Sequence, residues 1–154
     1  TVSLTIIRGE NTVVIKQVES LATVRVAPSV GMPGPIHAGA NNKAIIAFRT
    51  EEEWEQVGLR GLERWTEHTI TDMDAFRSEL KKVRDDGYAI SNQEMHTGAW
   101  GIAAPILDGN GFSIGSIGVS GPTFRYTKEL EDLTIHLVKE YGRAIGDELR
   151  FSNT

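Results

Sequence analysis

Alternating apolar and polar positions near the start of the chain predict a short antiparallel sheet. Residues 2–7 and 12–18 alternate in this way and are joined by Gly9-Glu10-Asn11, which is typical of a β-hairpin. Residues 21–26 show the same pattern and predict a third strand. The next stretch is expected to be a loop without regular structure, because it contains Pro28, Gly31, Pro33, Gly34 and Pro35.

Helical spacing and capping signals predict three helices in the middle of the chain. Residues 37–48 form the first, although Asn41 and Asn42 are weak helix formers, so we expect these two side chains to cap the backbone or to face a polar group. Two capping signals follow: Thr50 with Glu53, which opens an acidic helix, and Thr71 with Asp74, which opens a helix that ends at Gly87.

The last third of the chain predicts a long hairpin and a long helix. Residues 101–107 and 112–120 flank the turn Asp108-Gly109-Asn110-Gly111. A helix over residues 127–151 follows, and its apolar stripe is expected to consist of Leu130, Leu133, Leu137, Tyr141, Ala144 and Ile145. This order of elements predicts an α+β fold with an antiparallel sheet flanked by helices.

The second strand of the long hairpin has unusually small side chains on one face. By simple alternation this face carries Phe112, Ile114, Ser116, Gly118 and Ser120, and the other carries Ser113, Gly115, Ile117 and Val119. Gly101, across the turn, is also small. Two explanations remain open: a ligand cavity with the Ser120 hydroxyl in its wall, or glycines that let a helix pack closely on the sheet.

Composition excludes several classes of function. A chain of 154 residues fits one domain, and the absence of cysteine excludes disulfides, thiolate nucleophiles and Cys-based zinc sites. The four histidines lack metal-ligand spacing, and no paired carboxylates or nucleophile-base pair can be named, so we predict no metal, no cofactor and no enzymatic activity. The formal charge of −5 argues against DNA binding by this chain itself. The sequence shows neither a signal peptide nor a membrane-spanning apolar run, which favours the cytoplasm.

Several short motifs occur in a specific order along the whole chain. They are Pro35-Ile36-His37-Ala38, Lys43-Ala44, residues 69–71, Gly87-Tyr88-Ala89, Glu94, Gly98, Ile102-Ala103-Ala104-Pro105-Ile106 and Val119-Ser120-Gly121-Pro122. Through them the chain resembles the C-terminal effector-binding domain of IclR-family bacterial transcription regulators. The resemblance implies a GAF-like domain over residues 1–154, with a six-stranded antiparallel sheet and a small-molecule effector. It also implies a homodimer or homotetramer that contacts DNA only through an N-terminal winged helix-turn-helix domain. That domain is absent from this chain, which starts without Met.

The resemblance also implies a set of effector-binding residues. Carried over by position, they are Thr23, Val26, Ala40, Asn41, Ser91, Gly101, Gly118 and Ser120. The chain departs from its relatives at Asn42, where glycine is common, and at Ser91, where one known pocket has a carboxylate. Gly101 and Gly118 are expected to widen the pocket relative to relatives that have side chains there. Asn41, Ser120 and backbone N–H groups of the first helix are expected to donate hydrogen bonds to an anionic head. We therefore expect a pocket with an uncharged wall and an organic acid larger than a two-carbon or three-carbon oxoacid, aromatic acids included. Two alternatives remain: an enzyme of the same fold acting on a small acid, and an oligomerisation module with a vestigial pocket.

Overall fold

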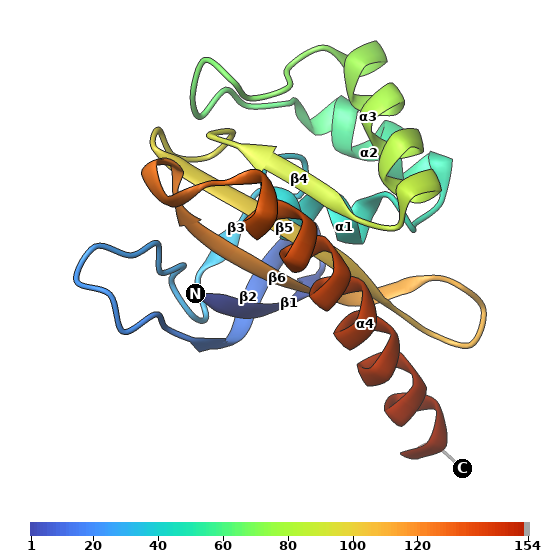
Figure 1. Ribbon diagram of the computed structural model, residues 1–154. Helices are drawn as coiled ribbons and strands as arrows, with labels where there is room; N and C mark the ends of the chain where they lie inside the picture. The colour runs from blue at the N-terminus through green and yellow to red at the C-terminus, as the bar shows by residue number, and fades with distance from the viewer. Residues whose placement is uncertain (153–154) are drawn as a thin grey trace.

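The computed structural model describes residues 1–152, so residues 153 and 154 of the predicted domain lie outside it. The strands are β1 (Val2–Arg8), β2 (Asn11–Val18), β3 (Pro33–Gly34), β4 (Ala89–Asn92), β5 (Ala99–Leu107) and β6 (Ser113–Pro122). The helices are α1 (Ala40–Ile46), α2 (Glu51–Arg60), α3 (Met73–Asp86) and α4 (Lys128–Ser152), and a 3-10 turn covers Thr123–Arg125. Figure 1 shows α4 crossing one face of the sheet.

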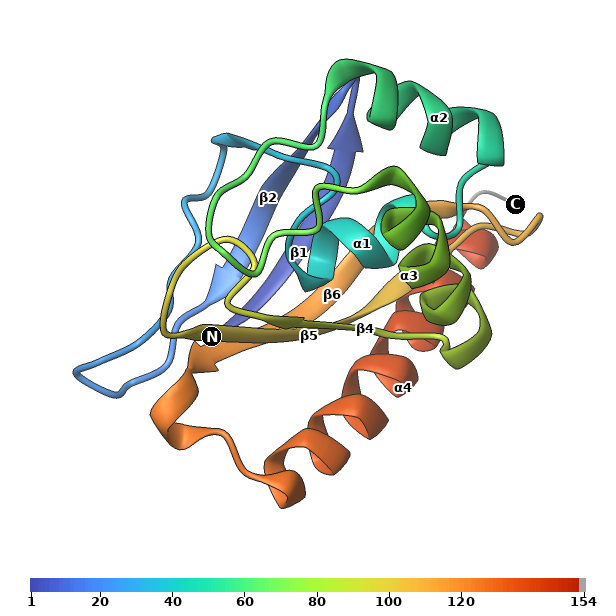
Figure 2. The same ribbon diagram turned by 90° about the horizontal axis from the view of Figure 1, so that it is seen from above.

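The six strands form one antiparallel sheet in the order β3-β2-β1-β6-β5-β4. Its centre pairs the first strand of the chain with the last, because β1 lies beside β6. Figure 2 shows α1, α2 and α3 on one side of the sheet and α4 on the other. The predicted α+β class and the six-stranded antiparallel sheet flanked by helices are therefore confirmed.

A separate hydrophobic core lies on each face of the sheet. On the side of α1, α2 and α3, the largest buried side chains are Trp54, Phe76 and Leu80. On the side of α4, Trp100 and Ile102 of β5 pack against Val138. The small side chains of β5 and β6 therefore belong to a sheet that is covered on both faces.

The predicted capping signals act as expected at α2 and at the end of α3. Thr50 and Glu53 form a reciprocal capping box, and Gly87 ends α3 with a left-handed φ of 81°. Partial burial would raise the pKa of the Glu53 carboxyl, but hydrogen bonds from Arg49 and from Thr50 hold that pKa below its ordinary value. The carboxylate therefore stabilises the start of α2.

The prediction of a third strand at residues 21–26 is wrong. These residues form part of a loop in which Leu21 is fully exposed and Val24 is about half exposed, so their alternation faces no packed layer. The free edge of β2 pairs instead with Pro33 and Gly34. A two-residue strand thus lies inside the segment that was expected to have no regular structure.

Two predicted helix starts shift by one to three residues. α1 begins at Ala40 rather than at residue 37, because Gly39 has a φ of 91° that interrupts the helical backbone, and it ends at Ile46. α3 is capped by Asp72 rather than by Thr71, since the Asp72 carboxylate accepts a hydrogen bond from the Ala75 amide.

The face of α4 that packs on the sheet differs from the predicted apolar stripe. Its buried residues are Thr134, Val138, Gly142 and Gly146, whereas Leu133, Leu137 and Tyr141 are exposed. The glycines let the helix approach β5 so closely that an added Cβ at Gly142 would lie 2.7 Å from the Pro105 carbonyl oxygen. Close backbone approach at the two glycines, together with the packing of Val138 and Leu130, thus sets the orientation of this helix. None of the helices in the described chain is both apolar and long enough to cross a membrane.

A β-bulge changes the predicted faces of β6. The pairing with β5 skips Ile114, because Ile106 lies opposite Gly115 and Leu107 lies opposite Ser113. Ser113 consequently points toward α1, where its hydroxyl donates to the Ile45 carbonyl oxygen at 2.6 Å. Simple alternation had assigned Ser113 to the opposite face.

Candidate functional site

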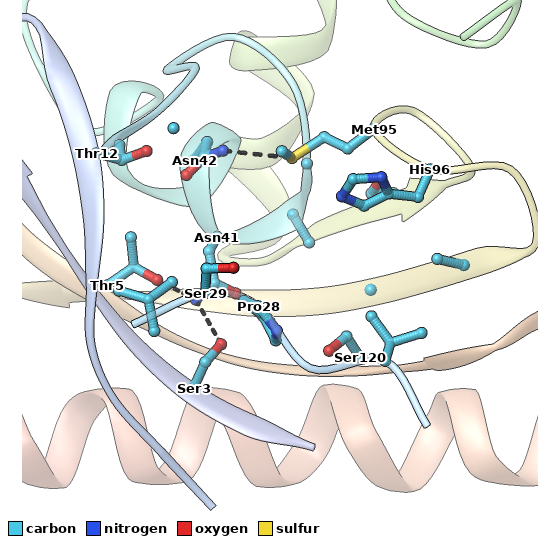
Figure 3. Close-up of a pocket in the computed structure, with 18 of the residues that line it drawn as sticks. Ser3, Thr5, Thr12, Pro28, Ser29, Asn41, Asn42, Met95, His96 and Ser120 are labelled. Carbon is cyan, nitrogen blue, oxygen red and sulfur yellow. Dashed lines mark hydrogen bonds between the residues drawn. The ribbon is translucent and has the colours of Figure 1, made fainter. Parts of the chain in front are cut away.

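A cavity of about 410 Å³ lies where the start of α1 meets one end of the sheet. Its walls come from β1, α1, the β5–β6 pair, the loop around Pro28 and the segment around His96 (Figure 3). These segments are far apart in the sequence, so the cavity depends on the whole fold. Its lining mixes apolar side chains such as Val26 and Trp65 with hydroxyl and amide groups.

Asn41 organises a polar cluster on one wall of the cavity. Its Nδ2 group donates hydrogen bonds to Ser3 Oγ at 3.2 Å and to Thr5 Oγ1 at 2.7 Å (Figure 3). A hydroxyl that accepts a hydrogen bond keeps its own hydrogen for a further acceptor. Ser3 and Thr5 therefore present donors at the cavity, whereas the expected donation by Asn41 itself is already used within the protein.

Ser120 contributes a third hydroxyl from β6. Its Oγ atom is buried and has no hydrogen-bond partner within the described part of the chain, while its backbone pairs with Thr1. A buried hydroxyl without a partner carries a free-energy cost of about 1–3 kcal/mol. An oxygen atom of a bound molecule would remove that cost, and the Ser120 side chain lines the same cavity.

The cavity wall carries little charge. Among the residues that line it there is no lysine, arginine, aspartate or glutamate, and His96, which is exposed, is the titratable side chain. The lining also lacks two neighbouring carboxylates or a serine hydrogen-bonded to a base. Across residues 1–152, no three His, Asp or Glu side chains gather as a metal ion would require. The lining thus offers hydroxyl groups and apolar surface to a bound molecule.

A buried ion network supports the wall formed by α1. The side chain of Lys43 is 1% exposed, and its ammonium donates to Glu79 Oε1 at 2.7 Å, Glu94 Oε1 at 2.6 Å and the Ile90 carbonyl oxygen at 2.7 Å. The second oxygen of Glu94 accepts from the Gly39 amide. Because Gly39 lines the cavity and Glu94 directly precedes lining residues, this network fixes two walls relative to each other.

The structure brings together six of the eight residues predicted as effector contacts. The six that line the cavity are Val26, Ala40, Asn41, Ser91, Gly101 and Ser120. Thr23 is exposed in the loop after β2 and does not line the cavity. Gly118 lies underneath Asn41, because an added Cβ at Gly118 would lie 1.8 Å from Asn41 Oδ1. The expectation that Gly118 widens the cavity is therefore wrong, since Asn41 occupies that space.

Several lining residues were not identified from the sequence. Ser3 and Thr5 are buried while Leu4 and Ile6, which alternate with them, are only half-buried, so the polar set of β1 faces inward. The alternation of the hydroxyl residues Ser3 and Thr5 along the first predicted strand was the sequence signal that could have indicated this part of the site. Trp65 and His96 come from loops that fold back over the sheet, and no local pattern in the sequence indicates that approach.

The sequence of this chain matches a described protein family over nearly its whole length. Residues 1–147 match the family model described as bacterial transcriptional regulator IclR C-terminal. The chain is 29% identical over 153 residues to the HTH-type transcriptional regulator KdgR and 32% identical over 150 residues to the HTH-type transcriptional repressor AllR, both of Escherichia coli K12. These matches cover 98% and 97% of this chain but only 58% and 55% of the two relatives.

A solved structure agrees with this relationship. The chain aligns with a transcriptional regulator from Rhodococcus sp. RHA1 at a TM-score of 0.92 and 26% identity, covering 99% of this chain and 62% of that one. The family model, the two relatives and this fold lead to the same assignment. The chain belongs to the IclR family of bacterial transcription regulators and corresponds to the C-terminal, effector-binding domain of that family.

Proposed function

We propose that this domain senses a small organic acid with one carboxylate and an apolar or aromatic body. The observation that carries the proposal is the convergence of the Ser3, Thr5 and Ser120 hydroxyls on an otherwise largely apolar, uncharged cavity. Three hydroxyl hydrogens suit oxygen acceptors such as a carboxylate or a carbonyl. The apolar lining suits the remainder of such a molecule.

The charge and the size of the cavity narrow the class of ligand. A molecule with several negative charges would lose its hydration without meeting a cation, because no lysine or arginine lines the wall. A volume of about 410 Å³ falls within the range of about 300–1,000 Å³ that is typical of small-molecule sites. A glyoxylate-sized acid would leave most of that volume unfilled. The proposed effector is therefore a larger monocarboxylic acid.

Effector binding is proposed to act on DNA binding elsewhere in a longer cytoplasmic protein. The domain spans little more than half the length of its curated relatives, which are HTH-type regulators. We propose that the full protein is a homodimer or homotetramer with a winged helix-turn-helix domain. The effector shifts the regulator between two states only by its difference in affinity for them. The lining residues include no pair suited to acid-base or nucleophilic chemistry, so catalysis is not part of this proposal.

A thermal-shift screen of residues 1–154 tests the proposal. The screen compares the stabilisation of the domain by four acids: benzoate, 4-hydroxybenzoate, phenylacetate and glyoxylate. A ligand present at about 100 times its Kd adds about 2.7 kcal/mol to the apparent stability. Gly101→Leu places a side chain in the cavity and should abolish the shift, since Gly101 lines it and an added Cβ there meets Ala40 at an ordinary 3.4 Å.

Gly109→Leu is the matched control for that screen, because an added Cβ at Gly109 meets nothing within 4 Å. This variant should respond to the acids as the wild type does. The proposal fails if only glyoxylate stabilises the wild type, or if Gly101→Leu responds as strongly as Gly109→Leu.

A further inference from the structure

A second cavity lies between α4, the end of α3 and β5, and it shares no lining residue with the first. Its volume is also about 410 Å³, and Phe48, Pro105 and Leu107 contribute an apolar floor. Four cationic side chains line it: Arg84, Lys139, Arg143 and Arg150. We call this cavity the basic cleft. Its single acidic lining residue, Asp147, leaves a formal charge of +3 on a chain whose net formal charge is −5.

The close approach of α4 to the sheet builds one side of the basic cleft. Gly142 and Gly146 lie against the carbonyl oxygens of β5, with 2.7 Å and 2.8 Å from their ideal Cβ positions to the nearest oxygen atoms. Lys139, Arg143 and Arg150 follow one another at spacings of about one and two helical turns, so they share one flank of the helix. The helix thus carries three of the four cations to the same opening.

Arg84 faces them from α3 and is held firmly in place. Its guanidinium donates to the carbonyl oxygens of Ala47 at 2.8 Å and Arg49 at 2.7 Å, and it lies 4.6 Å from the centre of the Trp54 ring. These contacts use only part of the five N–H groups of the guanidinium. Arg84 is therefore a preorganised cation with donors to spare.

Carboxylates within the described chain do not neutralise this group of cations. Arg150 pairs with Asp147 at 3.4 Å, whereas Lys139 donates to the Asp86 carbonyl oxygen, and residues 1–152 provide no hydrogen bond or ion pair to Arg143. By contrast, Lys128 of the same helix pairs with two carboxylates. The basic cleft thus retains positive charge that the rest of α4 balances locally.

Favourable interaction with helix ends explains only half of the cluster. Arg84 and Arg150 lie in the last turns of α3 and α4, where cations interact favourably with the helix dipole. Lys139 and Arg143 lie in the middle of α4, where that effect is absent. Like charges brought together in a cavity destabilise one another unless an anion joins them.

We propose that the basic cleft binds a small polyanion that carries phosphate groups. Guanidinium groups match the geometry of phosphate oxygens, and Lys139 adds a mobile point charge. The apolar floor has room for the organic part of a phosphorylated metabolite, and inorganic pyrophosphate offers the same charges without that part. The basic cleft is thus a second ligand site of a different chemical class from the proposed effector cavity.

Binding of pyrophosphate to residues 1–154 tests this proposal. Amide chemical shifts are followed at constant ionic strength of about 150 mM, where the Debye length is about 8 Å and general attraction is largely screened. We expect saturable shifts centred on Lys139, Gly142 and Arg143. Lys139→Gln/Arg143→Gln should weaken binding at least about tenfold. Lys16→Gln/Lys81→Gln, which removes the same charge from exposed positions outside the basic cleft, should leave it unchanged.

Each outcome of the titration decides the proposal. Equal weakening by both double variants, or shifts scattered over the surface, would show general electrostatic attraction and overturn it, as would the absence of saturable binding. A parallel titration with glycerol 3-phosphate distinguishes the sources: tighter binding of this organic phosphate indicates a phosphorylated metabolite, and tighter binding of pyrophosphate indicates an inorganic polyanion. Both results support the site, and neither depends on the acid proposed for the first cavity.

Discussion

Replacing Gly118 with alanine should destabilise the chain through Asn41. The added Cβ would lie 1.8 Å from Asn41 Oδ1 and 2.8 Å from Asn41 Cγ, so the amide must swing away. It then loses its hydrogen bonds to Ser3 and Thr5. Two such bonds are worth about 1–3 kcal/mol together. Alanine in a strand recovers about 0.5–1 kcal/mol relative to glycine, which leaves a net loss of up to about 2.5 kcal/mol.

A double-mutant cycle separates this mechanism from simple crowding. Asn41→Ala removes the same hydrogen bonds and also the obstacle, so Gly118→Ala should cost less than about 0.5 kcal/mol in that background. The tight contact with Ala103, at 3.0 Å, is common to both backgrounds and cancels in the cycle. Free energies of unfolding come from urea titrations in which all four proteins should show the same m-value. Additive costs, within about 0.5 kcal/mol, would refute the displacement of Asn41.

Two further predictions concern stability. Gly142→Ala should lower the free energy of unfolding by about 1–2 kcal/mol, because the collision with the β5 backbone outweighs the helix propensity of alanine. The control is Ala144→Gly at an exposed position of the same helix, which reports helix propensity alone, about 1 kcal/mol. An increase in stability for Gly142→Ala would contradict the packing argument. The carboxyl pKa of Glu53 is lowered in the folded chain, so its contribution is present above its unfolded pKa of about 4.5 and is lost as the pH falls through the lower folded value. The stability difference between wild type and Glu53→Gln, measured by urea unfolding, should shrink from pH 6 to about pH 3, and a difference independent of pH would disprove the role of the charge.

Local signals predicted the parts of the fold that depend on neighbouring residues. The Thr50–Glu53 capping box, the stop at Gly87 and the turn from Asp108 to Gly111 all involve hydrogen bonds or φ values set within a few residues. The sheet that joins these elements was predicted by their order and by the family resemblance. These signals depend on residues close together in the sequence rather than on tertiary contacts, which is why the sequence reveals them.

The failures share a tertiary cause. Leu21 and Val24 belong to an alternating segment that has no layer to cover. Helix α4 buries Gly142 and Val138 rather than the apolar Leu137, because the glycine allows close contact with β5 and the valine packs in the core on that face. In the candidate site, Gly118 leaves no open space, because the side chain of Asn41 fills it. Alternation and helical spacing indicate which faces exist, but not which partner occupies them.

Mapping the bound acid on the domain tests the central claim most directly. The acid that most stabilises residues 1–154 in the screen is titrated into ¹⁵N-labelled protein while amide shifts are followed. We predict that the largest changes occur at Asn41, Gly101 and Ser120, with little change at Arg143 in the basic cleft. Shifts centred away from the first cavity, or the absence of saturable binding by any of the larger monocarboxylic acids, would contradict an effector-sensing role for this site.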